Sequence, residues 1–138
     1  MTPEGPVRTT SGLVLIVDDN ERNLRLARDV LVFGGLRTVE AATATDGIRL
    51  ALETQPDVIL MDVRLPDMDG PAALAILRAD PRTRQIPIVA VTSSAMMGDR
   101  ERLLAAGFDG YLEKPINVRE FVDQVRGFSR SGDRGGGG

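Results

Sequence analysis

Residues 13–20 of this 138-residue chain read LVLIVDDN, five apolar residues followed at once by two acids and an amide. A nearly continuous apolar run of this length is typical of a strand buried on both faces, as in a parallel sheet. The polar residues Asp18–Asn20 then end the strand and offer side-chain caps to a helix that we expect to reach about Phe33. The stretch therefore predicts a strand that passes directly into a helix.

The same alternation of apolar run and amphipathic stretch recurs along the chain. We expect further strands at 36–42, 58–61, 86–91 and around 111–112, and further helices at 45–54, 71–78, 96–106 and 117–128. Repeated strand–helix units predict an α/β fold: a single, doubly wound, five-stranded parallel sheet with five helices on its two faces. Because right-handed crossovers leave few topologies, we expect the strand order 2-1-3-4-5.

The two ends of the chain differ from this pattern. Residues 1–12 show no hydrophobic periodicity, and residues 129–138 are polar and end in four glycines. We therefore expect one domain over 13–128, between a disordered N-terminal segment and a flexible, glycine-rich tail. No apolar run resembles a secretory signal or is long enough to span a bilayer, so we expect a cytoplasmic protein without membrane insertion.

The composition excludes several kinds of chemistry. The chain has no Cys, His or Trp and a formal net charge of −3. Disulfides, thiolate nucleophiles, structural zinc sites and serine–histidine triads are therefore excluded. Any metal must bind oxygen ligands, which favours a hard ion such as Mg2+. The mild acidity gives no general attraction to nucleic acid or to an anionic membrane.

Polar residues follow the predicted strands where a parallel sheet binds its ligands. The carboxyl ends of such strands share one edge, and this edge would gather Asp18, Asp19, Asp62, Thr92 and Lys114. Three neighbouring carboxylates cannot all ionise unless a cation neutralises them. Mg2+ suits such a cluster, because it binds one or two carboxylates together with waters and phosphate oxygens.

Each of these residues has a simpler interpretation when it is taken alone. Asp18 would suit a helix cap, Asp62 the start of a loop, and Thr92 a strand or cap residue. We interpret Asp67 and Asp69 as residues that merely initiate a loop. The joint placement at four strand ends favours a functional site.

Lys114 is the one lysine among 17 basic residues and stands directly before a proline. A lone lysine is usually a solvated surface charge. A functional interpretation is that the site requires a compact ammonium group, where a planar guanidinium would not fit.

Four segments together resemble the receiver domains of bacterial two-component response regulators, in the CheY-like superfamily. These segments are LIVDDN (15–20), LMDVRLPDMDG (60–70), VAVT (89–92) and YLEKPI (111–116). Their order, spacing and strand context agree, and the resemblance covers nearly everything between the two ends. It implies a flavodoxin/CheY-like fold and a phosphorylation-dependent signalling switch of a two-component phosphorelay. Such a switch assists its own phosphorylation and dephosphorylation and is not otherwise an enzyme.

The resemblance also implies the chemical roles of the acidic residues. Asp62 matches the phosphoacceptor, which takes a phosphoryl group from phosphohistidine and becomes an aspartyl phosphate. Asp19 matches a direct Mg2+ ligand, Asp18 a ligand through water, and Arg64 the position whose backbone carbonyl binds the metal.

Three further residues match the switch. Thr92 matches the hydroxyl that turns toward the phosphoryl group, and Lys114 the ammonium that pairs with it. Tyr111 matches the aromatic residue that then moves inward, so we expect the bistable element to be residues 92–98 together with Tyr111.

The resemblance implies protein partners. Because the chain has no His, the phosphoryl donor must be a separate histidine kinase or histidine phosphotransfer protein. The output should be protein contact through the fourth helix, fifth strand and fifth helix, without direct nucleic acid binding. Residues 95–102 look like those of stand-alone, cell-division-type (DivK-like) receivers, and also like those of receivers fused to hybrid kinases. Met96 and Met97 would suit either adaptable contacts or ordinary packing.

Other functions remain as alternatives. One is a receiver fragment of a hybrid histidine kinase. A less favoured one is a Mg2+-dependent phosphohydrolase with an aspartate nucleophile on the first strand, which would have a second Asp where Asn20 stands. A nucleotide or flavin binder lacks support, because neither glycine-rich phosphate-binding motif is present.

Overall fold

The computed structural model describes residues 12–93 and 99–129. These residues form five strands, β1 (Leu13–Val17), β2 (Arg37–Ala41), β3 (Val58–Asp62), β4 (Ile88–Thr92) and β5 (Gly110–Glu113). They also form five helices, α2 (Glu21–Phe33), α3 (Ala44–Thr54), α4 (Gly70–Ala79), α5 (Asp99–Ala106) and α6 (Val118–Phe128). Apart from Gly12 and Ser129, the expected N-terminal segment and glycine-rich tail lie outside the described residues.

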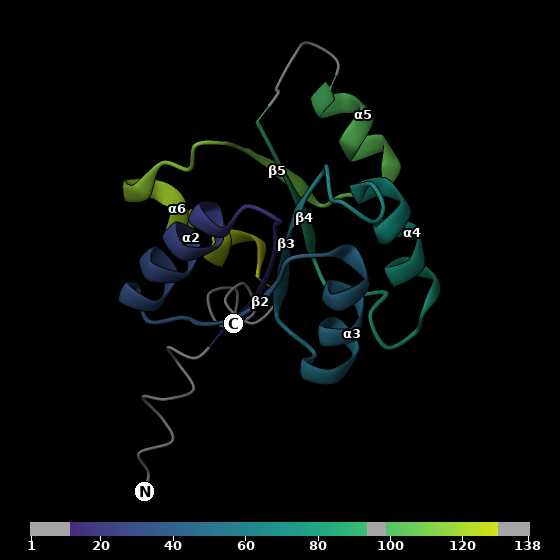
Figure 1. Ribbon diagram of the computed structural model, residues 1–138, viewed down its shortest axis with the longest axis horizontal. Helices are drawn as coiled ribbons and strands as arrows, with labels where there is room; N and C mark the ends of the chain where they lie inside the picture. The colour runs from purple at the N-terminus through teal and green to yellow at the C-terminus, as the bar shows by residue number, and fades with distance from the viewer. Residues whose placement is uncertain (1–11, 94–98, 130–138) are drawn as a thin grey trace, which may run out of the picture.

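All strand pairs are parallel, and the sheet has the order β2-β1-β3-β4-β5. Helices α2 and α6 cover one face, while α3, α4 and α5 cover the other (Figure 1). This arrangement confirms the predicted fold class and strand order.

The strands are apolar throughout because each face of the sheet packs against helices. Alternate residues point to opposite sides, so Leu15 and Val17 join one core cluster while Val14 and Ile16 join the other. The first cluster includes Leu74 of α4, among other side chains of the three-helix face. Within the described ranges, no helix is both long and apolar enough to cross a membrane.

Local capping residues set the helix boundaries close to those predicted. Asn20 caps α2 by accepting the N–H of Asn23, and Asn117 caps α6. Asp69, interpreted from the sequence as a loop initiator, is the N-cap of α4 and accepts the N–H of Ala72.

The start of β4 differs from the prediction by two residues. The apolar run begins at Ile86, but the strand begins at Ile88. Pro87 has no N–H to donate to a neighbouring strand, and the N–H of Ile86 donates to the carbonyl of Thr83 in the preceding turn at 3.1 Å. The predicted helix at 96–106 is described only from Asp99 onward, since residues 94–98 lie outside the described part.

Candidate functional site

The structure brings the three predicted carboxylates together at one edge of the sheet. Asp18 and Asp19 follow β1, and Asp62 is the last residue of β3, which pairs with β1. One carboxylate oxygen from each of the three lies within 4.8 Å of the others. Asp18 and Asp62 are buried, whereas Asp19 is exposed. The cluster is therefore half enclosed by protein and open to solvent at Asp19.

Lys114 enters this cluster from the loop after β5. Its ammonium lies 2.9 Å from Oδ2 of Asp18 and 3.0 Å from Oδ2 of Asp62, and its side chain is only 16% exposed. The peptide bond between Lys114 and Pro115 is cis. Burial would lower the pKa of Lys114, but the contacts with Asp18 and Asp62 outweigh burial and raise it. The amine is therefore held as a cation between two carboxylates.

The surroundings of Asp62 disfavour its ionised form. Burial is the main effect and raises the pKa of Asp62, and the nearby charge of Asp18 adds to it. The N–H of Arg64, 3.1 Å from Oδ1, and the Lys114 ammonium oppose this increase only in part. Added positive charge would therefore favour the ionised form of Asp62.

The donor set fits a hard divalent cation. Three carboxylates against one ammonium leave two formal negative charges in excess. The carboxylate oxygens are ligands of the kind that Mg2+ prefers, and exposed Asp19 leaves room for bound water. The residues of this cluster are therefore suited to bind Mg2+, the metal expected from the sequence.

The remaining predicted site residues lie at or near the same edge. Thr92 is the buried last residue of β4, and its carbonyl accepts the N–H of Lys114 at 2.8 Å. Arg64 lies two residues beyond Asp62, in a loop whose ends are joined by a bridge between Arg64 and Asp69. The carboxylates, Thr92, Lys114 and the backbone of Arg64 therefore share one end of the sheet.

Tyr111 lies farther back, within β5. It pairs with Ala90, two residues before Thr92, and is half-buried. The guanidinium of Arg100 lies 5.5 Å from the centre of its ring. The rest of the predicted bistable element, residues 94–98 with Met96 and Met97, lies outside the described residues.

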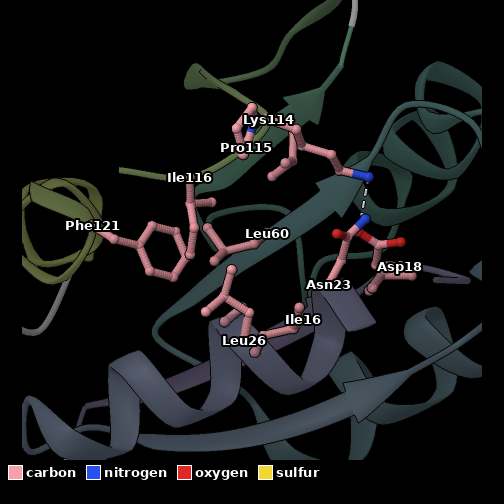
Figure 2. Close-up of a pocket in the computed structure, with 12 residues that line it drawn as sticks. Ile16, Asp18, Asn23, Leu26, Leu60, Lys114, Pro115, Ile116 and Phe121 are labelled. Atoms are coloured by element: carbon pink, nitrogen blue, oxygen red, sulfur yellow. Dashed lines mark ion pairs between the residues drawn. The ribbon is translucent and has the colours of Figure 1, made fainter. Parts of the chain in front are cut away.

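An apolar cavity of about 50 Å³ adjoins the charged cluster. Figure 2 shows Lys114 reaching toward Asp18 beside this cavity. Its apolar lining includes Ile16, Leu26, Leu60, Ile116 and Phe121. Apolar surroundings weaken dielectric screening, so charges at this end of the sheet interact more strongly than they would in water.

Sequence reasoning missed the role of Asp67. Its carboxylate accepts hydrogen bonds from the N–H of Ala44 at 2.8 Å, and from the N–H and hydroxyl of Thr45 at 2.8 and 2.6 Å. These bonds, that of the Thr45 hydroxyl foremost, lower the pKa of Asp67 to about 2. The partners are 22 and 23 residues away in the chain, so no local pattern signals the contact.

Residues 14–126 match the sequence profile of a protein family, the response regulator receiver domain. The chain belongs to this family. The polar-differentiation response regulator DivK of Brucella ovis is 39% identical over 115 residues, which are 83% of this chain and 94% of that protein. This receiver is thus related over most of its length to a response regulator of similar size.

Solved receiver structures agree with this assignment. The receiver domain of the sensor histidine kinase PA1611 from Pseudomonas aeruginosa PAO1 has a TM-score of 0.78 and 36% identity, covering 86% of this chain and 97% of that one. That structure has a magnesium ion coordinated in its active site cleft. A putative response regulator from Chloroflexus aurantiacus has a TM-score of 0.80 and 28% identity, with 86% and 97% covered. This receiver domain is a signalling module of the phosphorelay type.

Proposed function

We propose that Asp62 is the phosphoacceptor of this receiver and that a phosphohistidine outside these 138 residues is the donor. The observation that carries the proposal is the position of Asp62, which is buried at the end of β3, in contact with the Lys114 ammonium and close to two further carboxylates. The donor is assigned to a histidine kinase or phosphotransfer protein because this chain has no His.

The transfer requires an ionised carboxylate. One oxygen of Asp62 attacks phosphorus, the phosphorus–nitrogen bond breaks, and its electron pair leaves with the imidazole of the donor. The contact with Lys114 favours the ionised form of Asp62 and places positive charge beside the incoming phosphoryl oxygens. Thr92, buried at the end of the next strand, is the hydroxyl assigned to contact the transferred group.

Asp18, Asp19, Asp62 and the backbone carbonyl of Arg64 are the residues assigned to hold Mg2+. When bound, the ion supplies charge neutralisation at the phosphoryl oxygens. The compact cluster of oxygen donors supports this assignment, as does the magnesium coordinated in the related PA1611 receiver.

The new phosphoryl charge would select one of two arrangements around Thr92 and Tyr111. The signal would then pass to a protein target through the face formed by α5, β5 and α6. We assign the domain to the cytoplasm, as a switch that assists its own phosphorylation and dephosphorylation and converts no separate substrate.

Labelling with a small phosphodonor tests the assignment of Asp62. With acetyl phosphate and Mg2+, intact-mass measurement should show one added phosphoryl group in the wild type and none in Asp62→Asn. Asp29→Asn, an equivalent change at an exposed position of α2, is the control and should be labelled normally. Equal labelling of Asp62→Asn and the wild type would remove Asp62 from the mechanism.

A receiver joined to a hybrid histidine kinase is the second candidate. The 36% identity to the receiver domain of a sensor histidine kinase favours it. Both candidates use the same site and differ only in whether the donor histidine belongs to the same polypeptide. The coding sequence on both sides of these 138 residues distinguishes them.

A further inference from the structure

The junction of β2 and α3, residues 41–45, comprises the last residue of β2, the connecting turn and the first two residues of α3. This junction, called the β2–α3 turn below, contacts both segments that carry the acidic cluster. On one side, the carbonyl of Ala41 accepts the N–H of Asp18 at 3.0 Å. On the other, Ala44 and Thr45 donate three hydrogen bonds to the carboxylate of Asp67, at 2.6 to 2.8 Å. This β2–α3 turn provides none of the three clustered carboxylates, yet it is bonded to the segments on either side of them.

Asp67 acts as a cap for α3 from a distant part of the chain. The first N–H groups of a helix have no partner within the helix. Thr43 accepts the N–H of Asp46, and Asp67 accepts those of Ala44 and Thr45. A carboxylate here also interacts favourably with the helix dipole, and hydrogen bonds to a charged acceptor are strong. Asp67 therefore ties the loop that contains it to the N-terminus of α3.

The loop that contains Asp67 also contacts the carboxylate of Asp62. Asp67 belongs to the loop of residues 63–69, whose base is closed by a 2.7 Å bond from the N–H of Gly70 to the carbonyl of Val63. The base is tightly packed, because a Cβ on Gly70 would lie 3.0 Å from Cα of Val63. Within this loop, the N–H of Arg64 donates to Oδ1 of Asp62 at 3.1 Å. Moving the loop would therefore turn the Asp62 carboxylate.

We propose that Asp67 and Thr45 are positioning residues for the divalent cation site at Asp18, Asp19 and Asp62. Their contact holds the loop of residues 63–69 against the same turn that binds the backbone of Asp18, which fixes the separation of the two groups of ligands. This inference rests on the proposed function, because it concerns the affinity of the same site for Mg2+.

Calorimetric titration of the full chain with MgCl2 tests this inference. Asp67→Asn should weaken Mg2+ binding about tenfold, the low end of the range found when outer partners of metal ligands are removed. Asp46→Asn is a matched control, since it removes the same charge from an exposed position in the first turn of α3. Its affinity should equal that of the wild type, because exposed charges are largely screened.

A labelling experiment separates positioning from a loss of stability. If Asp67 acts through metal affinity, acetyl phosphate should label Asp67→Asn slowly at low Mg2+ and at nearly the wild-type rate at saturating Mg2+. A lower unfolding midpoint with an unchanged Mg2+ dissociation constant would instead assign Asp67 a purely structural role and overturn the inference.

A milder variant covers the case in which Asp67→Asn does not fold. Thr45→Ala removes only the 2.6 Å hydroxyl bond and leaves both backbone bonds in place. It should weaken Mg2+ binding about twofold to threefold, as expected for the loss of one hydrogen bond. An affinity equal to that of Asp46→Asn would overturn the inference.

The two proposals fail in distinguishable ways. If the wild type bound no Mg2+, both the metal assignment and this inference would be wrong. If the wild type bound Mg2+ and was labelled on Asp62, but Asp67→Asn had the affinity of Asp46→Asn, only the inference would be wrong.

Discussion

Lys114 shows how one side chain can satisfy two buried charges. Its ammonium contacts one oxygen of Asp18 and one of Asp62 at nearly equal distances, 2.9 and 3.0 Å. A point charge on a flexible stem can bridge them, whereas a guanidinium is wider and directs its donors in a rigid plane. This geometry gives a physical reason for a lysine in a chain whose other basic residues are all arginine.

Replacing Lys114 by Arg should therefore impair the site although the charge is kept. We expect labelling by acetyl phosphate to slow about tenfold, less than the roughly hundredfold or greater loss typical when a stabilising donor is deleted. The rate is measured by intact mass over time at saturating Mg2+. Arg119→Lys, a charge-conserving exchange at an exposed position, is the control. A wild-type rate in Lys114→Arg would show that any cation suffices there.

The residues of the site differ in how far sequence alone could place them. Asp18, Asp62, Thr92 and Lys114 could be placed, because each stands at or just beyond the end of an apolar run, and parallel strands end at one edge. Asp67 could not, because its partners belong to another loop and its role depends on how closely α3 approaches the loop of residues 63–69.

At the scale of elements, α3 lies against the strand that leads into the acidic cluster. A Cβ added to Gly47 would lie 2.8 and 3.1 Å from the two methyl groups of Val17, the residue before Asp18. Val17 is buried in the core, so it has little room to move. The absence of a side chain at residue 47 thus permits the close packing of α3 on β1.

Gly47→Ala should destabilise the fold by about 1 kcal/mol. Overpacking a core costs about 1–3 kcal/mol, and the better helix propensity of Ala recovers up to about 1 kcal/mol. Gly127→Ala is a matched control in α6, because nothing lies within 4 Å of its added Cβ, and it should be neutral or stabilising. Urea unfolding gives both values. If Gly47→Ala had the same free energy of unfolding as Gly127→Ala, the close packing of Gly47 on Val17 would not contribute to stability.

Element boundaries were predictable where a local residue sets them. Asn20 and Asn117 cap their helices as expected. The start of β4 was misplaced, because hydrophobicity alone does not show that the N–H of Ile86 bonds within a turn and that Pro87 has no N–H to donate.

At the scale of the whole molecule, the acidic cluster joins segments that are far apart in the chain. Asp18, Asp62 and Lys114 follow or end three different strands of one sheet. The topology itself was predictable, since buried parallel strands with right-handed crossovers allow few arrangements. The finer contacts between loops were not, because they depend on packing between the elements.

Mg2+ should therefore stabilise the entire fold. A ligand that binds only the folded state at roughly 100 times its dissociation constant adds about 2.7 kcal/mol. For a domain of this size, the unfolding midpoint should rise on the order of 10 °C. Thermal unfolding with MgCl2 and with EDTA measures the difference, and Asp62→Asn should show a smaller shift. An equal shift in that variant would place the bound ion elsewhere.

The single lysine has a practical consequence for chemistry on this protein. Reagents that acylate amines usually modify many surface lysines, so their yield says little about any one position. Here Lys114 is the one side-chain amine of the chain, and its nitrogen lies between two carboxylates of the candidate site. Because this amine is held as a cation, its acylation should be slow compared with that of the N-terminal amine. The rate of acylation at Lys114 therefore reports how readily its two ion pairs open.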